Sequence, residues 1–331
     1  MNLKLDTQRS PKNDHVLMIN NLNVNYSTSN GMVRAVRDAS ITVHQGSTLG
    51  IVGESGSGKS TLGFSLIRSV PPPGIISDGE IMFDGLDLLA LKEEEMRKVR
   101  GKMISMILQD PMTSLNPVLT VGGHLMEMIG AHEPKLSKEE KYDRATVLLS
   151  KLGISEERFN DYPHQFSGGM RQRLMIGLAL ALNPKLVIAD EPTTSLDVLV
   201  EAQILDLLNS LKKHFSLTLI LITHNIGIVA ETCDRTIIMY AGQVVEDTST
   251  KEMFEEPLHP YTQALLASVP NIKLDQQVLH WIPGWPPSLI DPPEGCSYHQ
   301  RCPYALDKCS REEPPLISIQ GGRKVKCFLF S

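Results

Sequence analysis

Short apolar runs alternate along the chain with longer segments in which apolar residues recur at helical spacing. The runs that predict buried strands cover residues 48–52, 104–108, 186–189, 217–222 and 235–239. Helical segments lie between several of them, at 60–70, 198–213 and 226–231. This alternation predicts an α/β fold with a mostly parallel sheet covered by helices on both faces. Two earlier runs, Val16–Tyr26 and Ala39–Val43, predict strands separated by a polar turn.

The same pattern divides the chain into three parts. Residues 1–14 are polar, and we expect a disordered lead there. Residues 15–256 carry the alternating elements, interrupted at about 118–180 by a helical subdomain with apolar residues at 3.6-residue spacing. From residue 257 onward prolines are frequent and four of the five cysteines occur. This change predicts a separate C-terminal extension over residues 257–331.

The sequence GESGSGKS at Gly53–Ser60 follows the apolar run Thr48–Val52 and precedes a helical segment. In this context G-x-x-x-x-G-K-[ST] is typical of nucleotide-binding phosphate loops. The glycines let backbone N–H groups point inward at phosphate oxygens, and the helix N-terminus adds partial positive charge. We predict that Lys59 reaches the β- and γ-phosphates and that Ser60 binds Mg²⁺. The predicted phosphate-binding residues are Gly53, Glu54, Ser55, Gly56, Ser57, Gly58, Lys59, Ser60 and Thr61.

A second candidate lies in KLVIADE, residues 185–191, where an apolar strand ends in two carboxylates. At the carboxyl edge of the sheet, Asp190 would lie beside the phosphate loop and hold Mg²⁺, directly or through water. Glu191 would point to the other side and polarise an attacking water. Taken alone, the pattern also fits a plain strand-to-turn boundary. The phosphate loop favours the catalytic interpretation.

A third candidate is Ser167-Gly168-Gly169, which precedes a helical segment. A hydroxyl and unhindered backbone N–H groups at a helix N-terminus form an anion cradle. An ordinary serine N-cap with neighbouring glycines is the alternative.

These motifs, in this order, resemble those of an ATP-binding-cassette (ABC) ATPase. GESGSGKS, QDPMTSLNP (109–117), HQFSGGMRQR (164–173) and the cysteine-bearing tail resemble the ATPase subunits of oligopeptide and dipeptide importers. Nickel-chelate and glutathione importers share these features. The resemblance implies a P-loop NTPase cassette: a mostly parallel RecA-like core, an antiparallel β subdomain, a helical subdomain and a small Cys-containing C-terminal extension. It also implies that ATP-driven dimerisation of two cassettes powers transport.

The resemblance further implies roles for single residues. Tyr26 matches the aromatic residue on which adenine stacks, although an ordinary strand tyrosine fits the sequence too. Gln109 matches the glutamine that senses Mg²⁺ and the attacking water, and His224 matches the histidine that contacts the γ-phosphate. Asp197 matches an aspartate of the interface between two cassettes. The signature residues that would cap the partner's ATP are Ser167, Gly168, Gly169 and Gln172.

Four cysteines of the tail, Cys296, Cys302, Cys309 and Cys327, have the spacing C-x₅-C-x₆-C-x₁₇-C. Four thiolates suit an iron–sulfur cluster or a tetrahedral Zn²⁺ site. Zinc knuckles of the C-x₂₋₄-C type do not occur here, and the tail resembles an importer-family extension thought to hold [4Fe–4S]. We therefore predict a [4Fe–4S] cluster, with zinc or unmetallated thiols as alternatives.

Charge and hydropathy restrict the cellular setting. The formal net charge is −6 and no basic run stands out, which argues against a nucleic-acid partner. The N-terminus has no apolar signal segment, and the apolar runs are shorter than the roughly 18 residues that span a bilayer. We expect a peripheral protein on the cytoplasmic face of the inner membrane.

The resemblance implies several partners. They are a second ABC ATPase chain (a heterodimer is favoured), two transmembrane permease subunits and, indirectly, an extracytoplasmic substrate-binding protein. The alternative function is that of a nucleic-acid-associated or regulatory ABC ATPase that is not coupled to transport.

Overall fold

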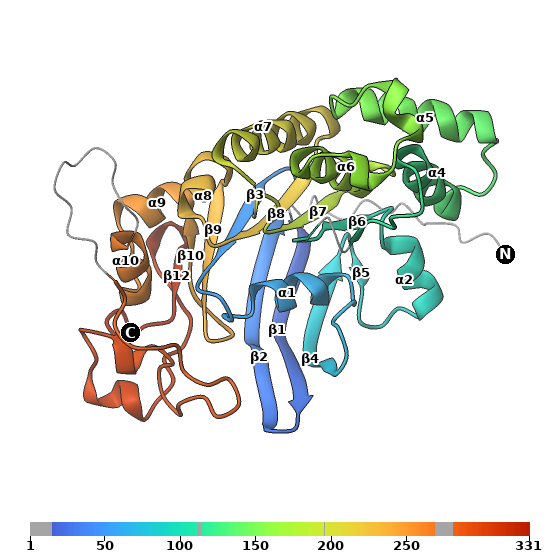
Figure 1. Ribbon diagram of the computed structural model, residues 1–331. Coiled ribbons are helices and arrows are strands. Elements are labelled where there is room, and N and C mark those ends of the chain that lie inside the picture. The colour runs from blue at the N-terminus through green and yellow to red at the C-terminus, as the bar shows by residue number, and fades with distance from the viewer. Residues whose placement is uncertain (1–14, 111–113, 195, 269–280) are drawn as a thin grey trace.

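The computed structural model describes residues 15–110, 114–194, 196–268 and 281–331. Its larger sheet has eight strands in the order β11-β12-β10-β9-β3-β8-β7-β6 (Figure 1). Strands β6, β7, β8, β3 and β9 are parallel neighbours, whereas β10, β12 and β11 extend the sheet in antiparallel fashion. The bounds are β3 Thr48–Val52, β6 Ile104–Ile107, β7 Leu186–Asp190, β8 Thr218–Thr223, β9 Arg235–Tyr240, β10 Gln243–Ser249, β11 Ile317–Ser318 and β12 Lys324–Val325.

A second, antiparallel sheet has the order β2-β1-β4-β5. Its strands are β1 His15–Thr28, β2 Gly31–His44, β4 Gly74–Phe83 and β5 Leu86–Asp87. Apolar side chains of this sheet, such as Leu17 and Ile41, share one buried cluster with Ile51 and Ile222 of the large sheet. Helix α1 (Lys59–Leu66) contributes Leu62 to the same cluster. The two sheets therefore enclose α1 and fix the segment that precedes it.

Helices cover the other face of the large sheet and extend beyond its β6 edge. Helices α4, α5 and α6, which fall in the segment predicted to be a helical subdomain, lie together at one end of the molecule (Figure 1). Their apolar positions, such as Leu125, Leu149 and Leu174, belong to one buried cluster with Val187 of β7. The helices are α2 Glu93–Val99, α4 Val121–His132, α5 Lys138–Lys151, α6 Gly168–Leu180, α7 Val198–Phe215, α8 Ile226–Thr232, α9 Thr250–Glu255 and α10 Pro260–Ala267. Among the helices that the structure describes, none has the length and apolar character needed to cross a bilayer.

Strands β4 and β5 and helix α2 have no counterpart in the elements expected from the apolar pattern. Strand β4, GIISDGEIMF, is interrupted by a register shift against β1 between Asn20 and Asn23. Gly79 lies at this irregularity with φ +108°, and a Cβ there would be 2.6 Å from the Leu22 Cα. A second register shift, between Asn23 and Val24, leaves Ser77 of β4 without a partner in β1. This extra residue breaks the period-two alternation by which a strand is recognised in a sequence. The predicted lead at residues 1–14 lies outside the described residues.

The C-terminal extension is joined to the cassette more closely than the change in composition indicated. Strand β12 pairs with β10 of the large sheet, with Val325 opposite Glu246. Tyr298 of the extension packs against Tyr240 and Tyr261, with ring centroids 5.2 and 5.4 Å away. The extension therefore completes both the sheet edge and an aromatic core, although its predicted boundary at residue 257 stays a prediction.

Acid is expected to destabilise this junction through His259. The imidazole is fully buried, and its Nδ1 accepts a hydrogen bond from the Tyr261 N–H at 3.0 Å. Burial lowers the pKa of His259 to about 3. Because an unfolded histidine takes up its proton near pH 6.5, the unfolded state gains protons first as the pH falls. The His259 contribution to stability is present above about pH 6.5 and is lost progressively toward pH 3.

Urea unfolding at pH 7 and pH 4.5 tests this prediction. The parent should lose unfolding free energy on acidification, and His259→Gln should lose less because it has no such group to protonate. His164→Gln, which alters an exposed histidine, is the control and should follow the parent. Equal acid sensitivity of parent and His259→Gln would contradict the assignment.

Candidate active site

The phosphate loop connects the fully buried strand β3 with helix α1 at the carboxyl edge of the parallel strands. Two of its glycines allow backbone contacts that no other residue permits. A Cβ on Gly53 would lie 2.1 Å from the Met239 carbonyl oxygen, and one on Gly58 would lie 2.2 Å from the Ala35 carbonyl oxygen. Gly58 also has φ +98°, a conformation that favours glycine. The loop is therefore fixed between β9 and β2.

Lys59 lies at the centre of the loop and is buried. Its Nζ donates hydrogen bonds to the Gly53 carbonyl at 2.8 Å and the Glu54 carbonyl at 2.9 Å. Burial lowers the pKa of Lys59, while the negative charges of Glu191, Asp190 and Glu54 act in the opposite direction. The loop thus presents a cation surrounded by backbone dipoles, which suits a phosphate.

Ser60 and Asp190 bring two hard oxygen ligands together beside the loop. The Ser60 hydroxyl donates to Asp190 Oδ1 at 3.0 Å, and the Asp190 side chain is buried at the end of β7. Burial raises the pKa of Asp190, and the hydrogen bond from Ser60 partly offsets this shift. Oxygens bound next to each other in an octahedral Mg²⁺ site lie roughly 2.9 Å apart. The pair therefore fits Mg²⁺, which commonly takes few protein ligands and completes its shell with water and phosphate.

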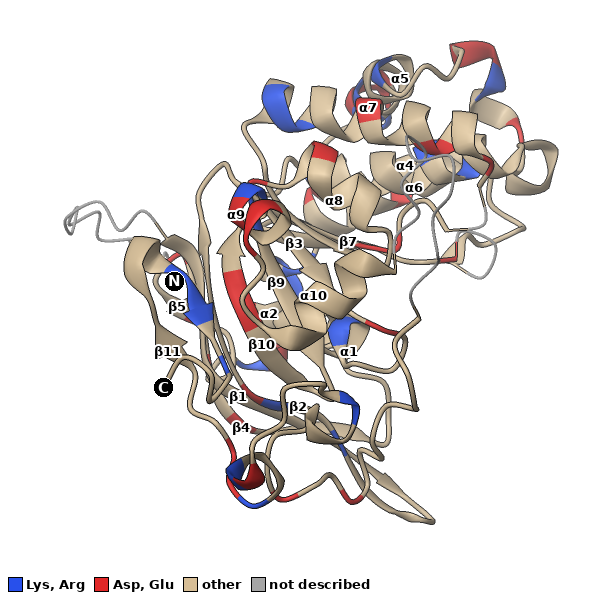
Figure 2. Ribbon diagram, turned by 90° about the vertical axis from the view of Figure 1, so that its left-hand side faces the viewer, with Lys and Arg blue, Asp and Glu red and all other residues tan. Residues whose placement is uncertain are grey.

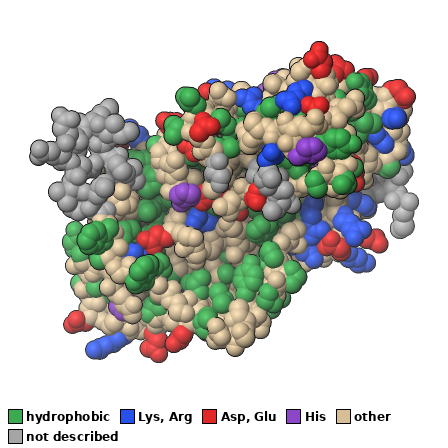
Figure 3. All heavy atoms as spheres, in the orientation of Figure 1, with side chains coloured by type: hydrophobic (Ala, Val, Ile, Leu, Met, Phe, Trp, Pro, Cys, Tyr) green, Lys and Arg blue, Asp and Glu red, His purple; other side chains and the backbone are tan. Residues whose placement is uncertain are grey.

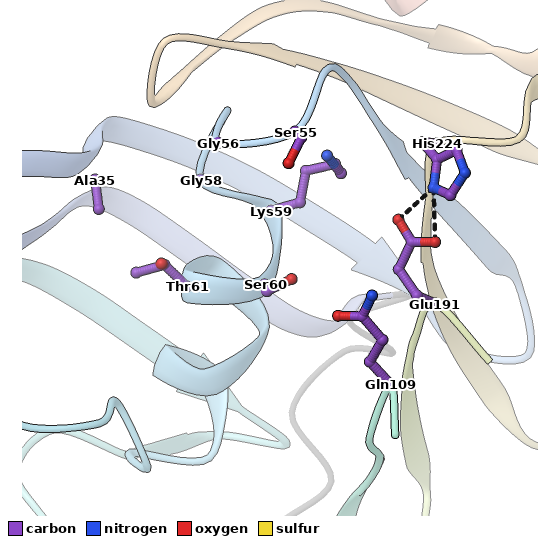
Figure 4. A pocket seen from close by; sticks show the side chains of 10 residues that line it. All are labelled: Ala35, Ser55, Gly56, Gly58, Lys59, Ser60, Thr61, Gln109, Glu191 and His224. Atoms are coloured by element: carbon purple, nitrogen blue, oxygen red, sulfur yellow. Dashed lines mark hydrogen bonds and ion pairs between the residues drawn. The ribbon is translucent and has the colours of Figure 1, made fainter. Parts of the chain in front are cut away.

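Three strand ends bring the remaining predicted catalytic residues to the same cavity (Figure 4). Gln109 follows β6, Glu191 follows β7 and His224 follows β8. His224 Nδ1 lies 2.7 Å from the Glu191 carboxylate. The cavity measures about 490 Å³ and is lined by Ala35, Ser55, Gly56, Gly58, Lys59, Ser60, Thr61, Gln109, Glu191 and His224.

Two residues of this region were not identified from the sequence. The Thr194 hydroxyl donates to Glu191 Oε2 at 2.7 Å and, together with His224, holds the carboxylate. A hydroxyl three residues after a candidate base could have indicated Thr194, but this spacing is common and therefore weak evidence. Ala35 of β2 also lines the cavity, where its small side chain leaves space. No pattern in the sequence identifies an alanine with this role.

The other predicted site residues lie outside the cavity lining. The Tyr26 hydroxyl is 3.5 Å from Thr61 Oγ1, and the tyrosine packs against the core rather than forming a cavity wall. Ser167 caps α6, accepting a hydrogen bond from the Met170 N–H at 3.4 Å, and Gly168 and Gly169 begin that helix. Gln172 is buried in α6, and Asp197 caps α7 by accepting from the Val200 N–H.

The metal centre predicted at Cys296, Cys302, Cys309 and Cys327 is wrong. Among the residues that the structure describes, no three His, Cys, Asp or Glu side chains are placed to hold a metal ion. The cysteines are free, and burial raises the pKa of Cys296 to about 11. Burial also raises the pKa values of Cys302 and Cys327. Thiols bind metals as thiolates, so raised pKa values oppose ligation. The spacing of the cysteines in the sequence does not determine how they are arranged in space.

The sequence of this chain matches known families along most of its length. Residues 36–194 match the family described as ABC transporter, and residues 245–309 match the one described as Oligopeptide/dipeptide transporter, C-terminal region. The chain is 48% identical to the oligopeptide transport ATP-binding protein OppD of Bacillus subtilis, over 95% of this chain and 88% of that protein. The chain belongs to the ATP-binding subunits of ABC transporters in the oligopeptide/dipeptide family.

Other members of this ABC family support the same assignment. The dipeptide transport ATP-binding protein DppD of Escherichia coli is 45% identical over 94% of this chain and 96% of its own length. Among solved structures, the dimeric ATP-binding cassette MJ0796, in a post-hydrolysis state bound to ADP and Pi, has a TM-score of 0.62. It is 28% identical and covers 71% of this chain and 98% of its own.

Membership of this ABC family confirms the predicted cassette fold and the predicted ATPase activity with ATP and Mg²⁺. It does not support the alternative of a nucleic-acid-associated or regulatory ATPase. Figure 2 agrees with this outcome, since Lys and Arg are interspersed with Asp and Glu rather than gathered on one face.

Proposed function

We propose that this ATPase is the energy-coupling subunit of a membrane importer for dipeptides or oligopeptides. The observation that carries the proposal is the convergence of the phosphate loop, the Ser60–Asp190 pair and the Glu191–His224 pair on one cavity, in a chain with the oligopeptide/dipeptide C-terminal region. The cavity residues support ATP hydrolysis, and the family match supports peptides as the transported substrates.

The loop residues Gly53–Thr61 would surround the phosphates of ATP and bind them through Lys59 and through backbone N–H groups other than that of Glu54, which donates to the Tyr261 hydroxyl. Ser60, Asp190 and Gln109 would hold Mg²⁺, which neutralises phosphate charge when bound. Lys59 would exchange its hydrogen bonds to loop carbonyls for phosphate oxygens. Phosphoryl transfer depends mainly on positioning and charge neutralisation. These residues would therefore position the phosphates and neutralise their charge before water attacks.

Glu191 would orient and deprotonate the attacking water. In this structure its two oxygens are occupied by His224 and Thr194. The His224 side chain is 64% exposed, whereas that of Glu191 is 12% exposed. Little packing opposes a movement of His224 toward the γ-phosphate, and this movement would free one Glu191 oxygen to accept a proton from water.

The signature residues would act on the ATP of a second cassette. Ser167, Gly168, Gly169 and Gln172 do not line this chain's own cavity. Asp197 lies beside Val198 and Leu199, residues that are 81% and 78% exposed. Exposed apolar groups of this kind mark surfaces that a partner covers. We favour a heterodimer with a different ABC ATPase chain, and Tyr26 stays a predicted adenine-stacking residue.

The remaining partners would be two permease subunits, which would contact the helical subdomain on the cytoplasmic side of the inner membrane. A substrate-binding protein outside the membrane would act through them. The C-terminal extension also carries exposed apolar groups, since Trp281 is 82% exposed and Trp285 is 88% exposed. Apolar side chains are grouped at the lower left of Figure 3, where Figure 1 places the extension. These groups are further candidates for contact within the assembly.

Purification of the tagged chain from solubilised native membranes tests this proposal. We expect two permease chains and a second ABC ATPase to co-purify. After reconstitution with the binding protein, a labelled dipeptide or pentapeptide should accumulate in the compartment that contains the ATPase and ATP. Recovery of the ATPase without any permease, or ATP hydrolysis that no peptide stimulates, would contradict the proposed coupling.

A further inference from the structure

Glu54 brings a carboxylate, with the same sign of charge as ATP, into the phosphate-binding loop. The structure pairs it with Arg301 of the C-terminal extension, 247 positions later in the chain. Arg301 Nη1 donates to Glu54 Oε2 at 2.8 Å, and Nη2 donates to Oε1 at 3.0 Å. This two-bond arrangement is the strong geometry of arginine–carboxylate pairs.

The guanidinium of Arg301 is held in place by the extension and by the cassette core. Its side chain is 5% exposed. Nε donates to the Pro283 carbonyl at 2.9 Å, and Nη2 also donates to the Ile282 carbonyl at 3.3 Å. Nη1 donates to the Tyr240 hydroxyl at 3.2 Å. With the two bonds to Glu54, all five N–H donors of the guanidinium have acceptors. These contacts hold the guanidinium in one orientation. The guanidinium in turn holds the Glu54 carboxylate through two hydrogen bonds.

Glu54 is fixed at its backbone as well as at its side chain. Its N–H donates to the Tyr261 hydroxyl at 2.9 Å, and its carbonyl accepts from Lys59 Nζ at 2.9 Å. Tyr261 belongs to the same aromatic cluster as Tyr240, with ring centroids 4.6 Å apart. The path from Arg301 through Glu54 to Lys59 is therefore made of direct contacts between buried or half-buried groups.

We propose that Arg301 is a positioning residue for ATP binding, through which the C-terminal extension sets the geometry and charge of the phosphate loop. The guanidinium neutralises Glu54, which would otherwise repel the phosphates. It also orients the Glu54 carbonyl that holds Lys59 before ATP arrives. This inference rests on the proposed role of the loop in binding ATP.

Equilibrium binding of ATP to the purified chain tests this proposal, with Arg301→Met as the first variant. Removal of one partner of a buried charge pair leaves the other uncompensated, so we expect the dissociation constant for ATP to rise by about 10-fold or more. The double variant Glu54→Gln/Arg301→Met has no uncompensated carboxylate. Its ATP affinity should return to within about 3-fold of the parent, because a neutral pair can replace a buried ion pair at little cost.

Rescue by the second substitution separates this role from a merely structural one, since general damage to the extension would not be repaired by altering Glu54. If Arg301→Met does not fold, Arg301→Lys replaces it. Lysine keeps the charge but not the planar two-bond geometry, so an intermediate loss that Glu54→Gln relieves is expected. Loss without rescue, or parent-like affinity in both Arg301 variants, would overturn the proposal.

Two further variants distinguish this outcome from failure of the proposed ATP site. Arg311→Met changes an exposed arginine of the same extension and should bind ATP like the parent. Lys59→Ala should lose ATP binding whether or not Arg301 is also replaced. If Lys59→Ala binds ATP as the parent does, the assignment of the loop itself is wrong. If only the Arg301 variants bind normally, the extension has no part in setting affinity.

Discussion

Replacement of Glu191 by glutamine is expected to lower the steady-state rate of ATP hydrolysis by about 100-fold or more, while ATP still binds. Glutamine keeps the size of the side chain. Its amide oxygen can accept from His224 and its NH₂ group can donate to the Thr194 hydroxyl, so contacts to both partners can survive. It cannot take up a proton from water at neutral pH. The lost step is therefore water activation, and the phosphate loop is unaffected.

The same variant should accumulate as an ATP-bound dimer with its partner ABC ATPase chain, because two cassettes that close on ATP reopen after hydrolysis. Phosphate release measures the first effect, and size-exclusion chromatography with the partner chain, ATP and Mg²⁺ measures the second. Glu231→Gln, at an exposed position of α8, is the matched control and should hydrolyse ATP at the parent rate. A Glu191→Gln protein with parent-like turnover would remove Glu191 from the role of base.

The sequence predicted the central sheet well because its strands are buried on both faces and read as unbroken apolar runs. The run 217–222 became β8, Thr218–Thr223, and 186–189 became β7, Leu186–Asp190. The amphipathic helices of the subdomain were also predictable, since α4 and α5 keep apolar residues on one side. The antiparallel sheet was harder, because β4 is half exposed and has two register shifts against β1.

The candidate site was predictable where chemistry depends on short local motifs. The Gly53–Ser60 loop and the Asp190-Glu191 pair each lie within a few residues, and the order of strands brings them to one edge. His224 needed the family resemblance, because a single histidine after a strand has no specific spacing. Its contact with Glu191 depends on the pairing of β7 with β8, which a linear pattern does not give.

Long-range features of the extension were beyond sequence reasoning. Arg301 meets Glu54 only because the extension folds back along β10 and the aromatic cluster. The cysteine tail shows the reverse case: the spacing of the cysteines predicted a metal site, and the described residues are not arranged to form one. In both cases the deciding information is where a proline-rich segment turns, and neither apolar periodicity nor spacing encodes that.

Lys59→Ala is expected to weaken ATP binding on the order of 100-fold, the largest effect on affinity that we predict for a single side chain. Two losses combine in this variant. The ammonium group that would contact the β- and γ-phosphates is gone, and Asp190, Glu191 and Glu54 lose the cation that interacts with each of them. ATP must then enter a cavity whose nearest side-chain charges are negative.

Titration of ATP by calorimetry measures the effect, with Lys251→Ala as the control because that lysine is exposed on α9. The melting temperature of Lys59→Ala without nucleotide should stay close to that of the parent or rise, since a buried charge with a lowered pKa costs desolvation energy. Loss of affinity together with retained stability would place the role of Lys59 in binding ATP. A protein that loses both would instead show that Lys59 mainly holds the empty loop together through the Gly53 and Glu54 carbonyls.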